Sequence, residues 1–147
     1  MNGEARAAPP AISADHLDLL TRPIVAVLTT MGADGQPQSS LVWVDFDGEC
    51  VRVNTTLERQ KGRNVRRDPK VSLLVVDPEN TSRFIQVRGD AELVRQGALE
   101  HLDALTRKYT RHPRYYGFVC PVEQQGRETR VIVRVHPRRV TLDAIHA

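Results

Sequence analysis

The sequence predicts a mainly β protein, a small closed or nearly closed antiparallel barrel of about six strands with two or three helices. Six runs have the alternating or continuously apolar, β-branched character of strands. Several of the links between them have turn length, and such short links join only antiparallel neighbours. The 147 residues, 40% hydrophobic and 27% charged, suffice for one globular domain with a core.

The N-terminal segment, residues 1–12, is rich in Ala, Pro and Gly, and we expect it to be disordered. Residues 13–147 are expected to form a single domain. This domain begins with a short amphipathic helix over residues 13–22, because Ser13 can cap its amide groups and Pro23 ends it.

The expected strands follow at residues 24–30, 38–46, 50–56, 70–77, 82–94 and 129–143. The turns before and after the second strand are short and contain Gly, so the first three strands are expected to form an antiparallel meander. Gly89 lies inside the long fifth strand and predicts a bulge or a bend there.

Two further helices are expected. The basic stretch after the third strand predicts one helix, which Asp68 and Pro69 should end. The segment 97–109 predicts the other, because Leu99, Leu102 and Leu105 recur at helical spacing. The segment between this helix and the last strand is loop-like, and together with Tyr109 at the helix end it contains four of the seven aromatic residues.

The positive charge of the chain is concentrated in one place. The net charge is +3, and the stretch Arg59–Lys70 alone contains six cationic residues in twelve positions with one acidic residue, Asp68. A local concentration of this kind indicates an anion-binding site better than a generally basic surface would.

Several classes of protein are disfavoured. The two cysteines, Cys50 and Cys120, are not in a Cys-x-x-Cys pattern and are expected to be free thiols. The five histidines show no metal-ligand spacing, so no metal site is expected. The sequence shows neither an apolar run of membrane-spanning length nor the apolar core of a secretory signal, so we expect a cytoplasmic protein without a membrane partner.

Lys61 is distinguished from the other cations of the basic stretch by its position. If the stretch is helical, Lys61 shares a stripe with Leu57 and Val65 that faces the body of the domain. A lysine there must either extend outward to solvent or meet an anion. A solvent-exposed helix face is the simpler interpretation for Arg66, Arg67 and Lys70.

Polar side chains also enter two of the expected strands, Gln38–Trp43 and Asn54–Thr56. Two interpretations are open for them: the lining of a ligand pocket, or a barrel rim where they meet water. Binding of single-stranded nucleic acid is disfavoured, because the basic stretch contains no aromatic side chain on which a base could stack.

Taken in order, the stretches "DGQPQSSLVW", "KGRNVRRDP", "VRGDAEL" and "RKYT" resemble the flavin and deazaflavin split β-barrel proteins, relatives of pyridoxamine phosphate oxidase. Within this family they are most similar to the oxidoreductases that use the deazaflavin coenzyme F420. The similarity extends from about Leu17 to Val140, and it implies an FMN-binding type of split barrel.

The resemblance implies a homodimer with cofactor sites between the subunits, and hydride transfer from reduced F420 to a flat, unsaturated small molecule. FMN is the alternative cofactor. The strand Gln38–Trp43 would lie along the cofactor ring, while Asn54–Thr56 with Arg59 and Lys61 would hold its phosphate. The expected cofactor-binding residues are Gln38, Ser39, Ser40, Val42, Trp43, Asn54, Thr55, Thr56, Arg59, Lys61, Gly62 and Asn64.

Gly62 would permit close backbone approach, and Asn64 would brace the loop. Gln60 separates Arg59 from Lys61, whereas pyridoxamine phosphate oxidases carry an adjacent arginine and lysine there, so oxidation of pyridoxamine phosphate is not expected. Two alternatives to a reductase stay open: a non-catalytic carrier of F420, FMN or haem, and a barrel that binds single-stranded nucleic acid.

Overall fold

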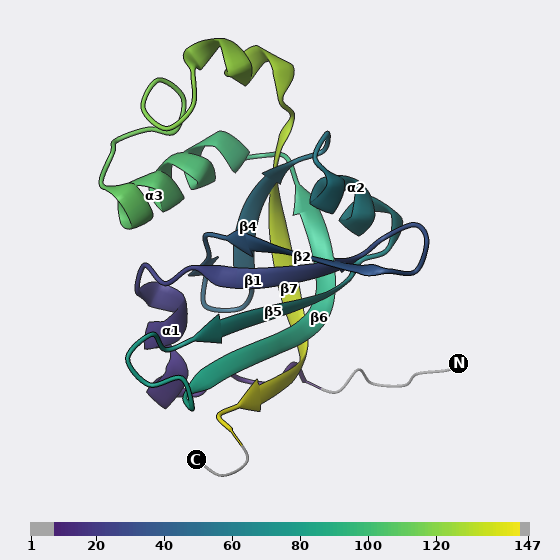
Figure 1. Cartoon of the computed structure of the whole chain (residues 1–147), viewed down its shortest axis with the longest axis vertical. Coiled ribbons are helices and arrows are strands. Elements are labelled where there is room, and N and C mark those ends of the chain that lie inside the picture. Colours follow the sequence, from purple (N-terminus) through teal and green to yellow (C-terminus); the bar gives the residue numbers. More distant parts are fainter. Residues whose placement is uncertain (1–7, 145–147) are drawn as a thin grey trace.

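A computed structural model describes residues 8–144, and it confirms the mainly β architecture. Seven antiparallel strands form one sheet that curls into a half-barrel, in the order β2-β1-β5-β6-β7-β4-β3 (Figure 1). The strands are β1 (Ala26–Met31), β2 (Pro37–Val42), β3 (Asp45–Phe46), β4 (Val51–Thr56), β5 (Lys70–Val76), β6 (Phe84–Val94) and β7 (Arg130–Leu142).

The helices lie at the ends of the barrel. Figure 1 shows α1 at one end, and α2 and α3 at the other. The helical elements are η1 (Ala14–His16), α1 (Asp18–Thr21), α2 (Gln60–Arg67), α3 (Ala98–Thr110) and η2 (Val122–Arg127). The predicted N-terminal helix is therefore a 3₁₀ turn followed by one α-helical turn, and η2 lies within the predicted loop.

The prediction of one strand over residues 38–46 is wrong. The structure divides this run into β2 and β3, which lie at opposite ends of the strand order. β2 pairs with β1 and β3 pairs with β4, so the opening strands do not form a continuous meander. The two residues between β2 and β3, Trp43 and Val44, carry the chain from one edge of the sheet to the other.

Side chains of α3 explain why the chain can leave the sheet at Val44. The backbone N–H of Val44 donates to the hydroxyl of Tyr109 (3.1 Å), and its carbonyl accepts from Lys108 Nζ (2.6 Å). These bonds satisfy backbone groups that a neighbouring strand would otherwise satisfy. The sequence of the run does not reveal the bend, because its partners lie more than sixty positions away.

The concave face of the sheet forms the core. Its central side chains, which include Leu28, Val53, Leu73, Val87 and Val133, are fully or almost fully buried. Burial alternates along β1, β4 and β5, and in β4 it matches the alternating sequence pattern from which that strand was predicted.

The bulge predicted at Gly89 is confirmed. The pairing register between β6 and β7 shifts between Arg88 and Gly89. A Cβ atom on Gly89 would lie 2.1 Å from the carbonyl oxygen of His136 on β7, so only glycine lets the two strands approach this closely.

Of the predicted disordered segment 1–12, residues 1–7 lie outside the described residues. Across residues 8–144, no helix has the length and apolar character needed to cross a membrane.

Candidate functional site

A cavity of about 390 Å³ opens where β2 and β4 meet α2, α3 and the segment that follows α3. One part of its lining is apolar and the other is cationic. The lining residues are Val25, Leu41, Val42, Trp43, Asn54, Arg59, Lys61, Leu102, Leu105, Tyr115, Val119 and Arg130.

Aromatic packing holds the apolar wall in place. The ring of Trp43 stacks on that of Tyr109, with centroids 5.4 Å apart and planes at 12°. Tyr115 meets the same indole edge-on at 6.5 Å. Tyr109 also donates its hydroxyl proton to the carbonyl of Ile24 (2.7 Å), which fixes the stack against the end of the barrel.

Three cationic side chains, Arg59, Lys61 and Arg130, form the other end of the cavity. Lys61 Nζ donates to the hydroxyl of Ser40 at 3.2 Å. Burial lowers the pKa of Lys61, and the positive charges of Arg59 and Arg130 lower it further. In the ligand-free protein the charged form of Lys61 is therefore destabilised, and a bound anion would stabilise it.

Arg130, at the start of β7, was not predicted as a site residue. Its guanidinium lies 4.8 Å from the ring centre of Tyr115, and its Nε donates to the hydroxyl of Tyr116 (2.9 Å). It also pairs with Glu128 at 2.8 Å, with both side chains under one tenth exposed. Sequence reasoning missed Arg130 because it begins a strand about seventy residues after Lys61, outside the basic stretch.

The charges at this end of the cavity do not cancel. Glu128 pairs with Arg130 and lies 3.6 Å from Arg59, so two guanidinium groups share one carboxylate, and Lys61 adds a third positive charge to the lining. The hydroxyl of Tyr116 also donates a hydrogen bond to Glu128 (2.5 Å). Burial, together with this carboxylate, raises the pKa of Tyr116 to about 12. The donor set therefore fits an anionic group such as a phosphate.

The structure brings several of the expected site residues together at this cavity. Val42, Trp43, Asn54, Arg59 and Lys61 line it, and Ser40 contacts it through Lys61.

Asn54 connects the cavity to α3. Its amide donates to the carbonyl of Ala98 (2.8 Å) and to His101 Nδ1 (3.1 Å), and its oxygen accepts from Arg130 (3.4 Å). Asn54 therefore holds one of the cations in position as well as lining the cavity.

The predicted stripe of residues on the inward face of the helix is confirmed in part. Val65 is buried and Lys61 is half-buried, but α2 begins only at Gln60, so Leu57 precedes the helix. Arg66, Arg67 and Lys70 are exposed, as predicted.

Other expected site residues lie away from the cavity lining. Thr55 is buried in the core, and its hydroxyl has no hydrogen-bond partner among the described residues. Thr56 accepts from the backbone N–H of Arg59 at 3.1 Å and so orders the turn that leads into α2. Ser39 contacts the hydroxyl of Thr29 (2.8 Å) at an exposed position.

Gly62 allows a close approach between α2 and β4. A Cβ atom at this position would lie 2.0 Å from the carbonyl oxygen of Thr56. The absence of a side chain thus lets the first turn of α2 sit directly against the end of β4, and this contact sets where Lys61 and Arg59 lie.

Asn64 braces α2 against the sheet. It is fully buried and donates to Thr30 Oγ1 (3.0 Å) and Gln38 Oε1 (3.2 Å), while its oxygen accepts from Gln60 (2.7 Å). Its hydrogen bonds therefore join the helix to β1 and β2.

We expect Asn64→Ala to lower the free energy of unfolding by roughly 1–3 kcal/mol, because buried partners lose their hydrogen bonds. Urea denaturation measures this loss. The control Gln38→Ala removes one exposed partner and should cost less. Unchanged stability in Asn64→Ala would contradict the bracing role.

Comparison with known proteins agrees with this geometry. The family model described as pyridoxamine 5'-phosphate oxidase matches residues 12–143. A solved structure named F420 reductase is 32% identical, with a TM-score of 0.75, over 88% of this chain and 98% of the other. A conserved hypothetical protein from Mycobacterium tuberculosis is 30% identical, with a TM-score of 0.69, over 94% of this chain and 88% of that protein.

A more distant structure, from Group A Streptococcus, is 21% identical with a TM-score of 0.62, over 89% of this chain and 93% of the other, and it bears on the fold alone. The family match spans nearly all the described residues, and the half-barrel and the cation-ended cavity are both present. The chain therefore belongs to the pyridoxamine 5'-phosphate oxidase-like family of split β-barrel proteins, a family that binds flavins or deazaflavins.

Proposed function

We propose that this protein is an F420-dependent reductase that transfers a hydride to a flat, unsaturated small molecule. The observation that carries the proposal is the cavity itself, in which an apolar aromatic wall leads to Arg59, Lys61 and Arg130. The 32% identity to a structure named F420 reductase supports F420 over FMN.

The residues of this chain would bind the cofactor and orient it. Lys61, Arg59 and Arg130 would hold the phosphate of the cofactor, because they are the convergent cations of the cavity. Val42 and Trp43 would lie beside the ring, and the apolar wall would exclude water from it. When bound, reduced F420 would supply the hydride.

A binding and turnover experiment tests the proposal. Purified protein is titrated separately with F420, FMN and a single-stranded oligonucleotide, and fluorescence or anisotropy is followed. We expect F420 to bind more tightly than FMN, and no binding of the oligonucleotide. Oxidation of reduced F420 should then depend on both the protein and an added quinone, enone or tetrapyrrole. F420 binding without any turnover would instead indicate a carrier.

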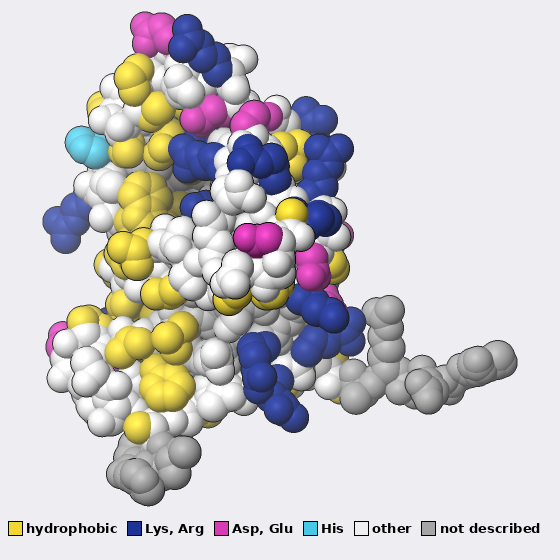
Figure 2. All heavy atoms as spheres, turned by 45° about the vertical axis from the view of Figure 1, so that its right-hand side comes forward, with side chains coloured by type: hydrophobic (Ala, Val, Ile, Leu, Met, Phe, Trp, Pro, Cys, Tyr) yellow, Lys and Arg dark blue, Asp and Glu magenta, His cyan; other side chains and the backbone are white. Residues whose placement is uncertain are grey.

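We also propose a homodimer in which a second copy closes the cavity. β2 is the edge strand of the sheet, and its Leu41 is 73% exposed although it lines the cavity. Val25 and Val119, which line the same cavity, are exposed as well, and Figure 2 shows hydrophobic patches on the surface. An apolar edge of this kind is typical of an interface.

Light scattering after size-exclusion chromatography checks the dimer. Leu41→Asp should shift the mass toward the monomer and weaken F420 binding, because the charge would be buried between the subunits. The control Leu142→Asp changes an exposed leucine near the end of β7 and should stay dimeric. A wild-type monomer with full F420 affinity would contradict the proposal.

A further inference from the structure

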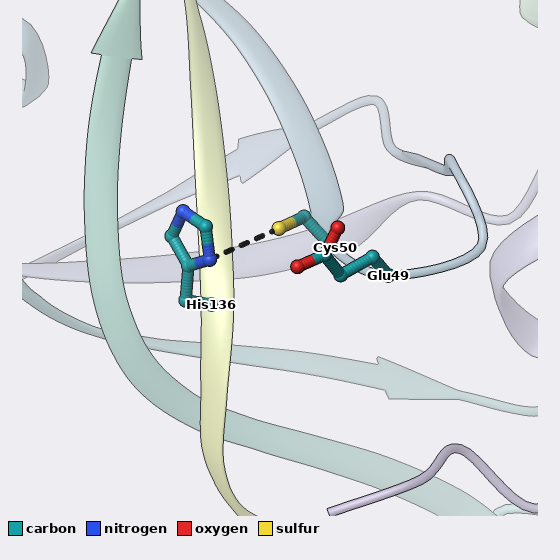
Figure 3. Close-up of side chains that lie close together, drawn as sticks. All are labelled: Glu49, Cys50 and His136. Atoms are coloured by element: carbon teal, nitrogen blue, oxygen red, sulfur yellow. Dashed lines mark hydrogen bonds between the residues drawn. The ribbon is translucent and has the colours of Figure 1, made fainter. Parts of the chain in front are cut away.

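A second cluster of chemically active side chains lies outside the cavity. The side chains of Glu49, Cys50 and His136 converge on one another (Figure 3), and one ligand atom from each lies within 4.8 Å of the others. Cys50 Sγ is 3.3 Å from His136 Nδ1. The two residues are 86 positions apart, so sequence spacing could not reveal the cluster.

The fold holds these three residues in place. Cys50 ends the β3–β4 turn, in which the side chain of Asp47 accepts from the backbone N–H groups of Glu49 (2.9 Å) and Cys50 (2.7 Å). The next residue, Val51, pairs with Val135 on β7, which brings His136 beside Cys50. Backbone pairing and a side-chain-stabilised turn thus bring the thiol and the imidazole together.

Glu92 orients the imidazole. His136 Nε2 lies 3.0 Å from Glu92 Oε1, and a carboxylate can only accept there. The Nε2 atom therefore carries the proton, and Nδ1 presents its lone pair toward Cys50. A histidine that donates to a carboxylate through one nitrogen and offers the other is the usual arrangement of a metal-binding histidine.

The charges around the cluster favour a cation. Three carboxylates, those of Asp47, Glu49 and Glu92, lie around it with one guanidinium, that of Arg134. Arg134 is already shared among these three, at distances of 3.0 to 3.9 Å. The local charge is therefore negative even with the guanidinium counted.

An ion can reach the cluster from solvent. The His136 side chain is 40% exposed and that of Glu49 is 69% exposed, while Cys50 lies buried behind them. His136 also lines a surface hollow with Pro9, Asp90 and Arg138, in which Arg138 is neutralised by Asp90 at 2.6 Å.

We propose that Glu49, Cys50 and His136 form a binding site for a divalent metal ion of the zinc class. The ligands would be the Cys50 thiolate, the Nδ1 atom of His136 and a carboxylate oxygen of Glu49, with water completing a tetrahedron. Binding releases the thiol proton to solvent. A thiolate with an imidazole selects zinc over magnesium or calcium, which prefer oxygen ligands alone.

Cobalt(II) titration of reduced, tag-free, full-length protein tests the site without F420 present. We expect one equivalent of cobalt to give sulfur-to-cobalt absorption in the near ultraviolet, and zinc to abolish it by displacement. Cys50→Ser should lose the band, whereas Cys120→Ser, which changes the other free thiol, should retain it. Glu92→Gln should weaken binding about 10- to 100-fold and keep the band.

Because Cys50 is buried, its replacement could disturb folding, and Glu49→Gln provides a second variant at an exposed side chain. It should keep the wild-type circular dichroism spectrum and bind cobalt more weakly. Absence of the sulfur band from wild-type protein at saturating cobalt, or its persistence in Cys50→Ser, would overturn the proposal.

Discussion

The Lys61→Met variant is expected to bind F420 about 5- to 30-fold more weakly than the wild type, a loss of ~1–2 kcal/mol for one charge-assisted contact. Methionine keeps the unbranched apolar part of the side chain and removes the ammonium group. The matched control Arg66→Met changes an exposed cation of the same helix and should bind normally. Fluorescence titration of each variant measures the two dissociation constants.

The pH dependence of F420 binding distinguishes a contribution from the charge of Lys61 from one that depends on its packing. The pKa of Lys61 is lowered in the free protein, so its ammonium group loses its proton at a lower pH than an ordinary lysine does. F420 affinity of the wild type should therefore fall as the pH rises through that pKa, and the affinity of Lys61→Met should fall less. Equal losses in Lys61→Met and Arg66→Met would contradict the assignment of Lys61 as the phosphate ligand.

Lys61→Met should not destabilise the ligand-free protein. Because the folded state lowers the pKa of this lysine, the unfolded state binds the proton more tightly. The charged amine therefore costs stability at neutral pH, and this cost shrinks as the pH rises above the folded pKa and is gone above the pKa of an ordinary lysine. Thermal unfolding without ligand should give a Tm equal to or above that of the wild type, while binding is impaired.

The Gly62→Ala variant is expected to lose about 3 kcal/mol of stability or more, because its Cβ would overlap a backbone oxygen that cannot move aside easily. The position of that oxygen, on Thr56, is 2.0 Å from the added carbon. For a protein of this size the loss corresponds to a fall in Tm of roughly 6–12 °C. Thermal unfolding followed by circular dichroism measures it.

Gly126→Ala is the control, because an added Cβ there meets no atom within 4 Å. Its stability should stay within about 0.5 kcal/mol of the wild type. If Gly62→Ala kept its Tm and lost only F420 binding, the glycine would serve the ligand directly, as the family resemblance implies, and the packing interpretation would be wrong.

Much of the fold could be predicted from the sequence, because local patterns report burial. Alternation along residues 50–56 and 129–143 predicted two central strands, and Gly89 predicted the bulge that the structure confirms. The break at Trp43 and Val44 could not be predicted in this way. It depends on the hydrogen bonds that Val44 makes with Lys108 and Tyr109, two side chains that the packing of α3 against the barrel brings to it.

The residues of the candidate site likewise fall into those that local sequence patterns predict and those that they do not. The helical spacing of Lys61 and Val65 predicted a cation turned toward the domain, because helical periodicity is encoded locally, whereas Leu57, the third member of the predicted stripe, precedes α2. Arg130 at the cavity and the meeting of Cys50 with His136 could not be predicted, because strand pairing brings these side chains beside partners far away in the sequence.

By itself, the sequence determined the strand and helix periods, the site of the bulge and the identity of one inward lysine, because each depends on neighbours within a few positions. Only the tertiary structure decided which cations share a cavity, where the chain leaves the sheet and which thiol meets which imidazole. The physical reason is that antiparallel pairing and helix docking set these distances between segments tens of residues apart.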